Sequence, residues 1–139
     1  NPRLTVRGVR GAHQPLRVVL AGKTPLPRGA HVFTDAFRAR TRVFKTRSLE
    51  EALAELGAEG VTSVLIEGGG RVLGEALDRR LVHRTVMYLA PILSGGETLA
   101  FAGIGVGSSA EAPRIRDPEL VRIGPDLRLS GDLEWPSGR

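Results

Sequence analysis

The segment Val61–Leu77 constrains the fold of this 139-residue chain more than any other part of its sequence. It contains an apolar run, then Glu67 and three glycines, then the apolar spacing of a helix. The pattern predicts a buried strand over residues 61–66, a tight turn and a helix, as in α/β sheets. The first amides of a helix have no partner within the helix and carry a partial positive charge. The segment therefore predicts an anion-binding turn with one carboxylate beside it.

The glycines and the carboxylate each leave two interpretations open. Gly68, Gly69 and Gly70 would either let a phosphate approach the backbone or simply form a tight turn. The dinucleotide-binding fingerprint requires glycine where Leu73 stands, and no Gly-Lys-Ser/Thr follows, so neither standard phosphate loop is present. Glu67 would face a ligand from the carboxyl end of a parallel strand, or would cap the neighbouring loop or pair with an arginine.

The remaining pattern predicts a sheet with helices and a hairpin at the end. Ser48 and Glu51 form a capping box for a helix that ends at Gly57 or Gly60. Alternation of strands and helices, closed by a hairpin, indicates an α/β fold with a mostly parallel central sheet and an antiparallel edge. The expected strands, besides the one over residues 61–66, cover residues 16–20, 31–34, 41–44, 85–90, 120–123 and 127–130.

Several polar residues carry weaker expectations. Alternating Arg38, Arg40 and Arg42 would share one face of a strand; a solvated face is favoured over contact with the 2′-phosphate of a dinucleotide. Glu75 and Asp78 are expected on the solvated side of the second helix. The glycine-rich stretch 102–109 is expected to be a mobile loop.

Composition excludes several classes of function. The chain has no cysteine, which excludes disulfides, thiol catalysis and the zinc deaminase signature. Its three histidines have no metal-ligand spacing, so no metal site is expected. No signal peptide is visible and no apolar run approaches the roughly 20 residues of a membrane span, so we expect a cytoplasmic protein that binds no membrane.

The net charge of +5 rests on 18 arginines and two lysines. The arginines are scattered and only six aromatic residues are present to stack on bases, so nucleic-acid binding is not favoured. The first residue is Asn1 rather than Met, which we interpret as a sign of a fragment or a processed chain.

Four segments in the same order resemble one family, the C-terminal reductase domain of the bifunctional riboflavin-biosynthesis deaminase/reductase. The resemblance covers essentially the whole chain. Its segments are Asn1–Arg7, Gln14–Leu20, Val64–Gly70 running on to Leu89–Gly96, and Gly124–Gly131.

The resemblance implies a dihydrofolate-reductase-like fold and an NADPH-dependent reductase. Its substrate would be the phosphorylated pyrimidine 5-amino-6-(5-phosphoribosylamino)uracil, whose ribose is reduced to the ribityl form by hydride transfer. The family's substrate contacts fall on Leu4, Arg7 and Glu67, and a guanidinium suits a phosphate. The resemblance also implies a homodimer. It places the cofactor contacts on Gly22, Gly68, Gly69, Gly70, Arg71, Val72, Leu73, Gly74 and Glu75. It identifies no catalytic acid or base.

The chain departs from the resembled family at identifiable places. Ala21–Gly22 stands where the family has an acid followed by Ser or Gly, and His83–Arg84 replaces an acidic pair. Members carry a strand, a helix and a second strand before the point where this chain begins. We therefore interpret residues 1–139 as a reductase domain without that part, and we expect reduced activity from them alone.

Two other functions remain open. One is a reductase of the same fold for another heterocycle, and the other is a catalytically silent dimerisation module.

Overall fold

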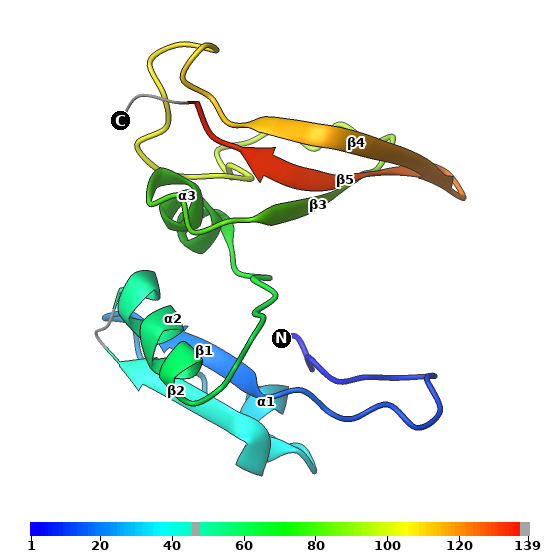
Figure 1. The fold of residues 1–139 in the computed structure, drawn as a ribbon. Helices are drawn as coiled ribbons and strands as arrows, with labels where there is room; N and C mark the ends of the chain where they lie inside the picture. Colours follow the sequence, from blue (N-terminus) through cyan, green and yellow to red (C-terminus); the bar gives the residue numbers. More distant parts are fainter. Residues whose placement is uncertain (46–47, 137–139) are drawn as a thin grey trace. The chain divides into compact units, whose positions relative to one another are not determined.

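The structure is a computed structural model that describes residues 1–45 and 48–136 (Figure 1). The chain divides into two compact units, Asn1–Val61 and Thr62–Arg139, each described separately below. The first unit contains β1 (Arg17–Ala21), α1 (His31–Thr34), the 3-10 helix η1 (Arg38–Arg40), β2 (Thr41–Lys45) and α2 (Leu49–Ala58). The second contains α3 (Gly70–Asp78), β3 (Arg84–Leu89), β4 (Arg114–Ile123) and β5 (Asp126–Glu134).

The first unit is a parallel strand pair covered by α2. β1 and β2 pair in register from Arg17 opposite Thr41 to Ala21 opposite Lys45. Phe44 of β2 packs with two buried residues of α2, and partly buried apolar residues surround this core. The residues of this core, buried and partly buried together, are Phe44, Ala52, Leu56, Val18, Leu20 and Val61.

Helix α2 begins and ends as its sequence predicts. The Ser48 hydroxyl accepts from the Glu51 amide, and the Glu51 carboxylate accepts from the Ser48 amide. At the other end Gly60 has φ +87°, and the amides of Gly60 and Val61 donate to the carbonyls of Gly57 and Leu56. These two bonds form a Schellman motif, in which a glycine takes the left-handed position.

The predicted strand over residues 31–34 is wrong, because His31–Thr34 forms a single helical turn. The Asp35 amide donates to the His31 carbonyl, and Val32 is buried. The carbonyl of Val32 accepts from two side chains of other elements, Arg17 at 3.0 Å and Thr41 at 2.7 Å. These tertiary bonds outweigh the weak local β preference of Val32 and Thr34.

An ion pair between a buried arginine and a partly exposed aspartate joins β1 to the residue after α1. The Arg17 side chain is 1% exposed and donates to both carboxylate oxygens of Asp35, at 2.6 and 2.9 Å. It also donates to the carbonyls of Arg3 and Val32. The hydrogen bonds from Arg17 lower the pKa of Asp35 below its ordinary value of 3.8.

The second unit is an antiparallel sheet of order β3-β5-β4, with α3 preceding it (Figure 1). The hairpin β4–β5 turns at Gly124, which has φ +60°. A register shift between Arg116 and Glu119 marks a bulge, where Asp117 has φ +45°. The predicted terminal hairpin is thus confirmed and is longer than the sequence suggested.

The predicted buried strand over residues 61–66 is wrong. Within the described residues this segment belongs to neither sheet, and the exposed fractions of Val64 and Leu65 are 43% and 78%. An apolar run becomes a strand only where a neighbour supplies hydrogen bonds on its edge. Whether such a neighbouring strand exists cannot be read from the apolar run alone.

The α/β class and the antiparallel hairpin are confirmed by the structure. Parallel pairing is present between β1 and β2, and the described residues form two separate hydrogen-bonded sheets. The element order observed is β1, α1, η1, β2, α2, α3, β3, β4, β5.

Replacing Gly57 or Gly74, both within helices, by alanine should change the stability of the protein in opposite directions. A Cβ at Gly74 would lie 2.0 Å from the Ala102 carbonyl oxygen, whereas one at Gly57 would meet nothing within 4 Å. G57A should raise the free energy of unfolding by about 0.5–1 kcal/mol because glycine loses more chain entropy in a helix. G74A should lower it by about 1–3 kcal/mol through overpacking. Urea unfolding measures both, and equal stabilisation by the two substitutions would contradict the contact.

Replacing Asp35 by asparagine should make stability less dependent on pH. Because the folded-state pKa of Asp35 is lowered, its ionised form stabilises the fold above pH 3.8, and this stabilisation is lost as pH falls through the folded-state value. D35N should therefore reduce the free energy of unfolding at pH 7. The difference from wild type should shrink below about pH 4. Denaturant titrations across this range check the sign, and a difference independent of pH would contradict it.

Candidate functional site

The N-terminus of α3 presents an open backbone surface. Gly69 is its N-cap, and no side chain within the described residues caps the helix. The amides of Val72 and Leu73 donate to the Gly69 carbonyl, whereas the amides of Gly70 and Arg71 have no acceptor among the described residues. A Cβ at Gly69 would meet nothing within 4 Å, so its outer face is accessible. The geometry is that of an anion-binding helix start.

Gly70 and Gly74 have a different reason to be glycine. A Cβ at Gly70 would lie 2.2 Å from the Leu99 carbonyl oxygen, and one at Gly74 would lie 2.0 Å from that of Ala102. The Ala102 amide donates to the Gly70 carbonyl at 2.9 Å. The backbone after β3 therefore lies directly on this face of α3. Close packing explains these two glycines, whereas the open position of Gly69 leaves space for a ligand.

Asp78 holds the same loop at the other end of α3. Its two carboxylate oxygens accept from the amides of Ile104, at 2.7 Å, and Gly105, at 3.0 Å. Asp78 is exposed, as expected, but its carboxylate also accepts from two backbone amides that the sequence pattern did not place near it. The first part of the predicted mobile stretch is thereby tied to the helix. We name Leu99–Gly105 the α3 loop.

The other predicted cofactor residues of this unit follow one another on the helix. Arg71 is exposed, and Val72 and Leu73 are half-buried. Val72 packs beneath the turn, since a Cβ at Gly68 would lie 2.8 Å from its Cβ atom. Glu75 forms an i,i+4 ion pair with Arg79 at 3.5 Å, on the outer face of the helix.

Glu67 lies directly before the glycine turn and is exposed. Residues 61–66, directly before it, form no strand, so its predicted place at the carboxyl end of a parallel strand is wrong. Its carboxylate makes no ion pair within residues 1–45 and 48–136. The alternative that Glu67 pairs with an arginine is therefore not found there, and the carboxylate is accessible to a ligand donor.

The predicted substrate contacts of the first unit lie in a segment without regular structure. Leu4 has φ +49°, a left-handed conformation that costs energy for a branched side chain, and Arg7 is exposed. The side-chain amide of Gln14 accepts from the Val6 amide at 3.0 Å and donates to the Val6 carbonyl at 3.1 Å. Gly22, also predicted as a cofactor contact, is exposed just after β1.

The arginine alternation does not lie on one strand face. Arg38 and Arg40 belong to η1, and only Arg42 is on a strand. Arg42 binds Glu55 at 2.6 Å and also Glu59, and its hydrogen bond lowers the pKa of Glu59. The expected row of solvated arginines is therefore wrong, because a helical turn intervenes and α2 supplies the counterions for Arg42.

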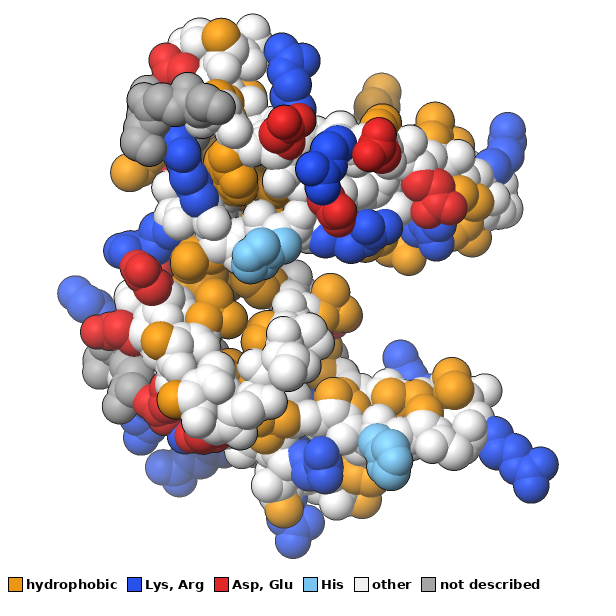
Figure 2. Space-filling view, in the orientation of Figure 1, with side chains coloured by type: hydrophobic (Ala, Val, Ile, Leu, Met, Phe, Trp, Pro, Cys, Tyr) orange, Lys and Arg blue, Asp and Glu red, His pale blue; other side chains and the backbone are white. Residues whose placement is uncertain are grey.

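Charged side chains of the second unit also neutralise one another. Figure 2 shows acidic and basic side chains interspersed over its sheet. Arg84 and Arg116 both approach Asp132, and Arg128 binds Glu119 at 2.8 Å. The charges on this sheet are therefore mixed in sign and largely paired.

Two further absences bear on the site. No group of three potential metal ligands occurs within the described residues, and none of their helices is both long and apolar enough to cross a bilayer.

A hollow in the first unit was missed by sequence reasoning. It has a volume of about 440 Å³ and lies between the N-terminal segment and the α1–η1 region. No spacing in the sequence could have found it, since the α1 turn was expected to be a strand. Its lining residues are Arg3, Thr5, His31, Thr34, Asp35, Ala36 and Phe37.

Together the fold and the α3 turn define an α/β domain with an uncapped helix start that is open at Gly69. Residues 1–129 match the family described as the RibD C-terminal domain. The chain belongs to this family.

Curated relatives support the same assignment. The chain is 38% identical over 133 residues to riboflavin biosynthesis protein RibD of Mycobacterium tuberculosis, covering 94% of this chain and 38% of the relative. It is 33% identical over 158 residues to RibD of Bacillus amyloliquefaciens, with 94% and 42% covered. The chain thus spans less than half the length of the curated relatives it matches.

Solved structures support the dihydrofolate-reductase-like fold. The structure of RibD from Acinetobacter baumannii superposes with a TM-score of 0.79 at 21% sequence identity, covering 96% of this chain and 43% of that one.

Replacing Asp78 by alanine should release the α3 loop. The amides of Ile104 and Gly105 would lose their acceptor, so their hydrogen exchange should accelerate about tenfold or more, the effect of losing a charge-assisted bond. Exchange measured by NMR checks this. E97Q is the control, since it removes an exposed carboxylate from the same connection between β3 and β4, one that accepts from neither of these two amides. Equal exchange in D78A and wild type would show that Asp78 does not hold the loop.

Proposed function

We propose that this chain is the NADPH-dependent reductase of riboflavin biosynthesis. It would reduce the ribose of 5-amino-6-(5-phosphoribosylamino)uracil to the ribityl form. The observation that carries the proposal is the match of residues 1–129 to the RibD C-terminal domain. Relatives named riboflavin biosynthesis proteins, from bacteria and from Arabidopsis thaliana, support the pathway.

The α3 turn fits the pyrophosphate of a nicotinamide dinucleotide. The free amides of Gly70 and Arg71 point out of an uncapped helix start, and the outer side of Gly69 is open. Arg71 adds a cation in the first turn, where a phosphate needs one. Gly68 and Val72 shape the turn, while Leu73, Gly74 and Glu75 continue the helix. Gly22 of the first unit is the further proposed contact of the cofactor.

The substrate contacts are proposed on Leu4, Arg7 and Glu67. The exposed Arg7 guanidinium would bind the substrate phosphate through a bidentate fork. The carboxylate of Glu67 would accept hydrogen bonds from the pyrimidine or sugar and orient them. NADPH would supply the hydride when bound, and the proposed contacts of the chain would orient the substrate for it.

Two proposals accompany the activity. We propose a homodimer, which a monomeric mass in sedimentation equilibrium would contradict. We also propose cytoplasmic localisation, which cell fractionation checks.

Substitutions at the proposed substrate contacts should raise the substrate KM. R7A should raise it about 100-fold and E67Q about tenfold, since charged hydrogen bonds are worth about 1.5–3 kcal/mol. Steady-state kinetics with NADPH oxidation as the readout measures both, in the chain with whatever precedes it in the full protein.

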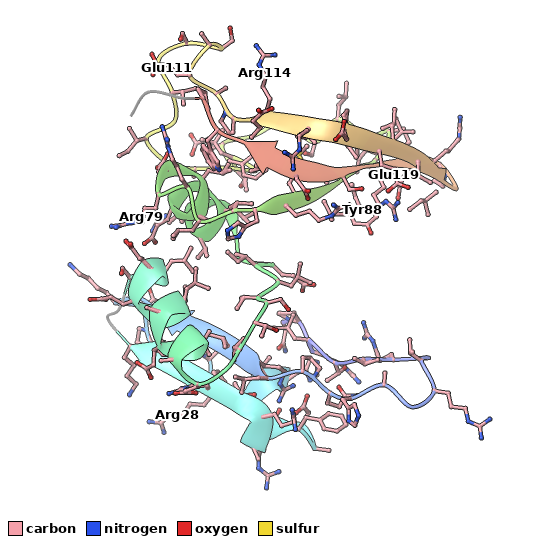
Figure 3. All side chains as sticks on the ribbon, viewed as in Figure 1. Arg28, Arg79, Tyr88, Glu111, Arg114 and Glu119 are labelled. Atoms are coloured by element: carbon pink, nitrogen blue, oxygen red, sulfur yellow. The ribbon has the colours of Figure 1, made fainter. Side chains whose placement is uncertain are left out.

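Two exposed residues provide matched controls. Arg114, labelled in Figure 3, lies on β4, is exposed and is not a proposed contact, so R114A removes the same charge as R7A without removing a proposed contact. E134Q serves E67Q in the same way, since Glu134 is exposed on β5 and is not a proposed contact. Wild-type kinetics in both R7A and E67Q would overturn the site assignment.

The other functions give distinct results. A chain that binds NADPH but turns over only another heterocycle is a different reductase. A chain that binds no NADPH in a titration is a silent module.

A further inference from the structure

Two peptide groups in the N-terminal segment are held by side chains from the lead-in to β1. The Arg3 carbonyl, which accepts from Arg17 Nη1 at 2.9 Å, belongs to the peptide that joins Arg3 to Leu4. The Val6 carbonyl, which accepts from Gln14 Nε2 at 3.1 Å, belongs to the peptide that joins Val6 to Arg7. Each restrained peptide therefore comes directly before one proposed substrate contact.

Besides these bonds the segment is held only near its ends among the described residues, where Asn1 accepts from the His31 amide and the Pro15 carbonyl accepts from Arg40. Residues 1–16 form no helix or strand, so no backbone ladder fixes Leu4 and Arg7. Gln14 closes a ring with Val6 through two opposed hydrogen bonds, which fixes both sides of that residue. Arg17 is itself fixed by Asp35 and by the Val32 carbonyl. Leu4 keeps φ +49° next to the peptide that Arg17 holds.

We propose that Gln14 and Arg17 are positioning residues that set the place of Arg7 and Leu4 for the substrate. The proposal rests on the proposed function. A guanidinium binds a phosphate well only when its geometry is set beforehand, because ordering a mobile chain on binding costs free energy. Arg17 sets the start of the segment and Gln14 sets the point from which the Arg7 side chain departs.

The Q14E variant tests the proposal with little change of volume. It keeps the acceptor for the Val6 amide but removes the donor to the Val6 carbonyl, so two oxygens face one another. We expect the substrate KM to rise about tenfold, with kcat and the NADPH KM within about twofold of wild type.

T41V is the matched control. It also removes one side-chain donor to a backbone carbonyl of the first unit, that of Val32, which keeps its bond from Arg17. A purely structural role for Gln14 would move the melting temperatures of Q14E and T41V alike and leave the substrate KM of both unchanged.

A double-mutant cycle shows whether Gln14 acts through Arg7. Q14E introduced into the R7A background should change the substrate KM by less than about twofold, because the side chain that it positions is gone. Additive effects of Q14E and R7A, or a wild-type substrate KM in Q14E alone, would overturn the inference. If the wild-type full protein turns over no substrate at all, the proposed function fails instead.

Discussion

The buried guanidinium of Arg17 is the interaction on which the first unit depends. One side chain donates to Asp35, to the Val32 carbonyl at α1 and to the Arg3 carbonyl near the N-terminus. A buried charge needs a counterion and hydrogen-bond acceptors. Nη1 and Nη2 of Arg17 have them in the three segments, while Nε has no partner among the described residues, so these bonds keep the three segments together. Through Arg17, β1 thereby fixes the position of the N-terminal segment, which has no helix or strand of its own.

The second unit is organised by a different constraint, the close approach of backbone to helix. The α3 loop reaches α3 only because Gly70 and Gly74 have no side chain, and Asp78 then binds its far end. The glycines at the start of α3 and within it thus have two different roles. Gly70 and Gly74 make room for protein, while Gly69 remains open at the helix start.

Local signals in the sequence were sufficient where the interaction partners are close in the chain. The capping box of Ser48, the glycine end of α2 and the hairpin at Gly124 are all fixed by residues a few positions apart. The strand prediction failed for residues 31–34 and 61–66, where apolar β-branched residues depend on neighbours that are distant in sequence. In the candidate site, the glycine turn before a helix was predictable, but the α3 loop and the role of Asp78 were not.

The sequence by itself determined the family, the two helices α2 and α3, and an uncapped helix start preceded by a carboxylate. It did so because capping, turn conformation and helical spacing are local properties. Only the tertiary structure decided that Arg17 and Gln14 hold the peptides before Leu4 and Arg7, and that a loop covers one side of α3. Those contacts join residues 8 to 32 positions apart, and hydrogen bonds over such distances depend on the folded path of the chain rather than on any spacing in it.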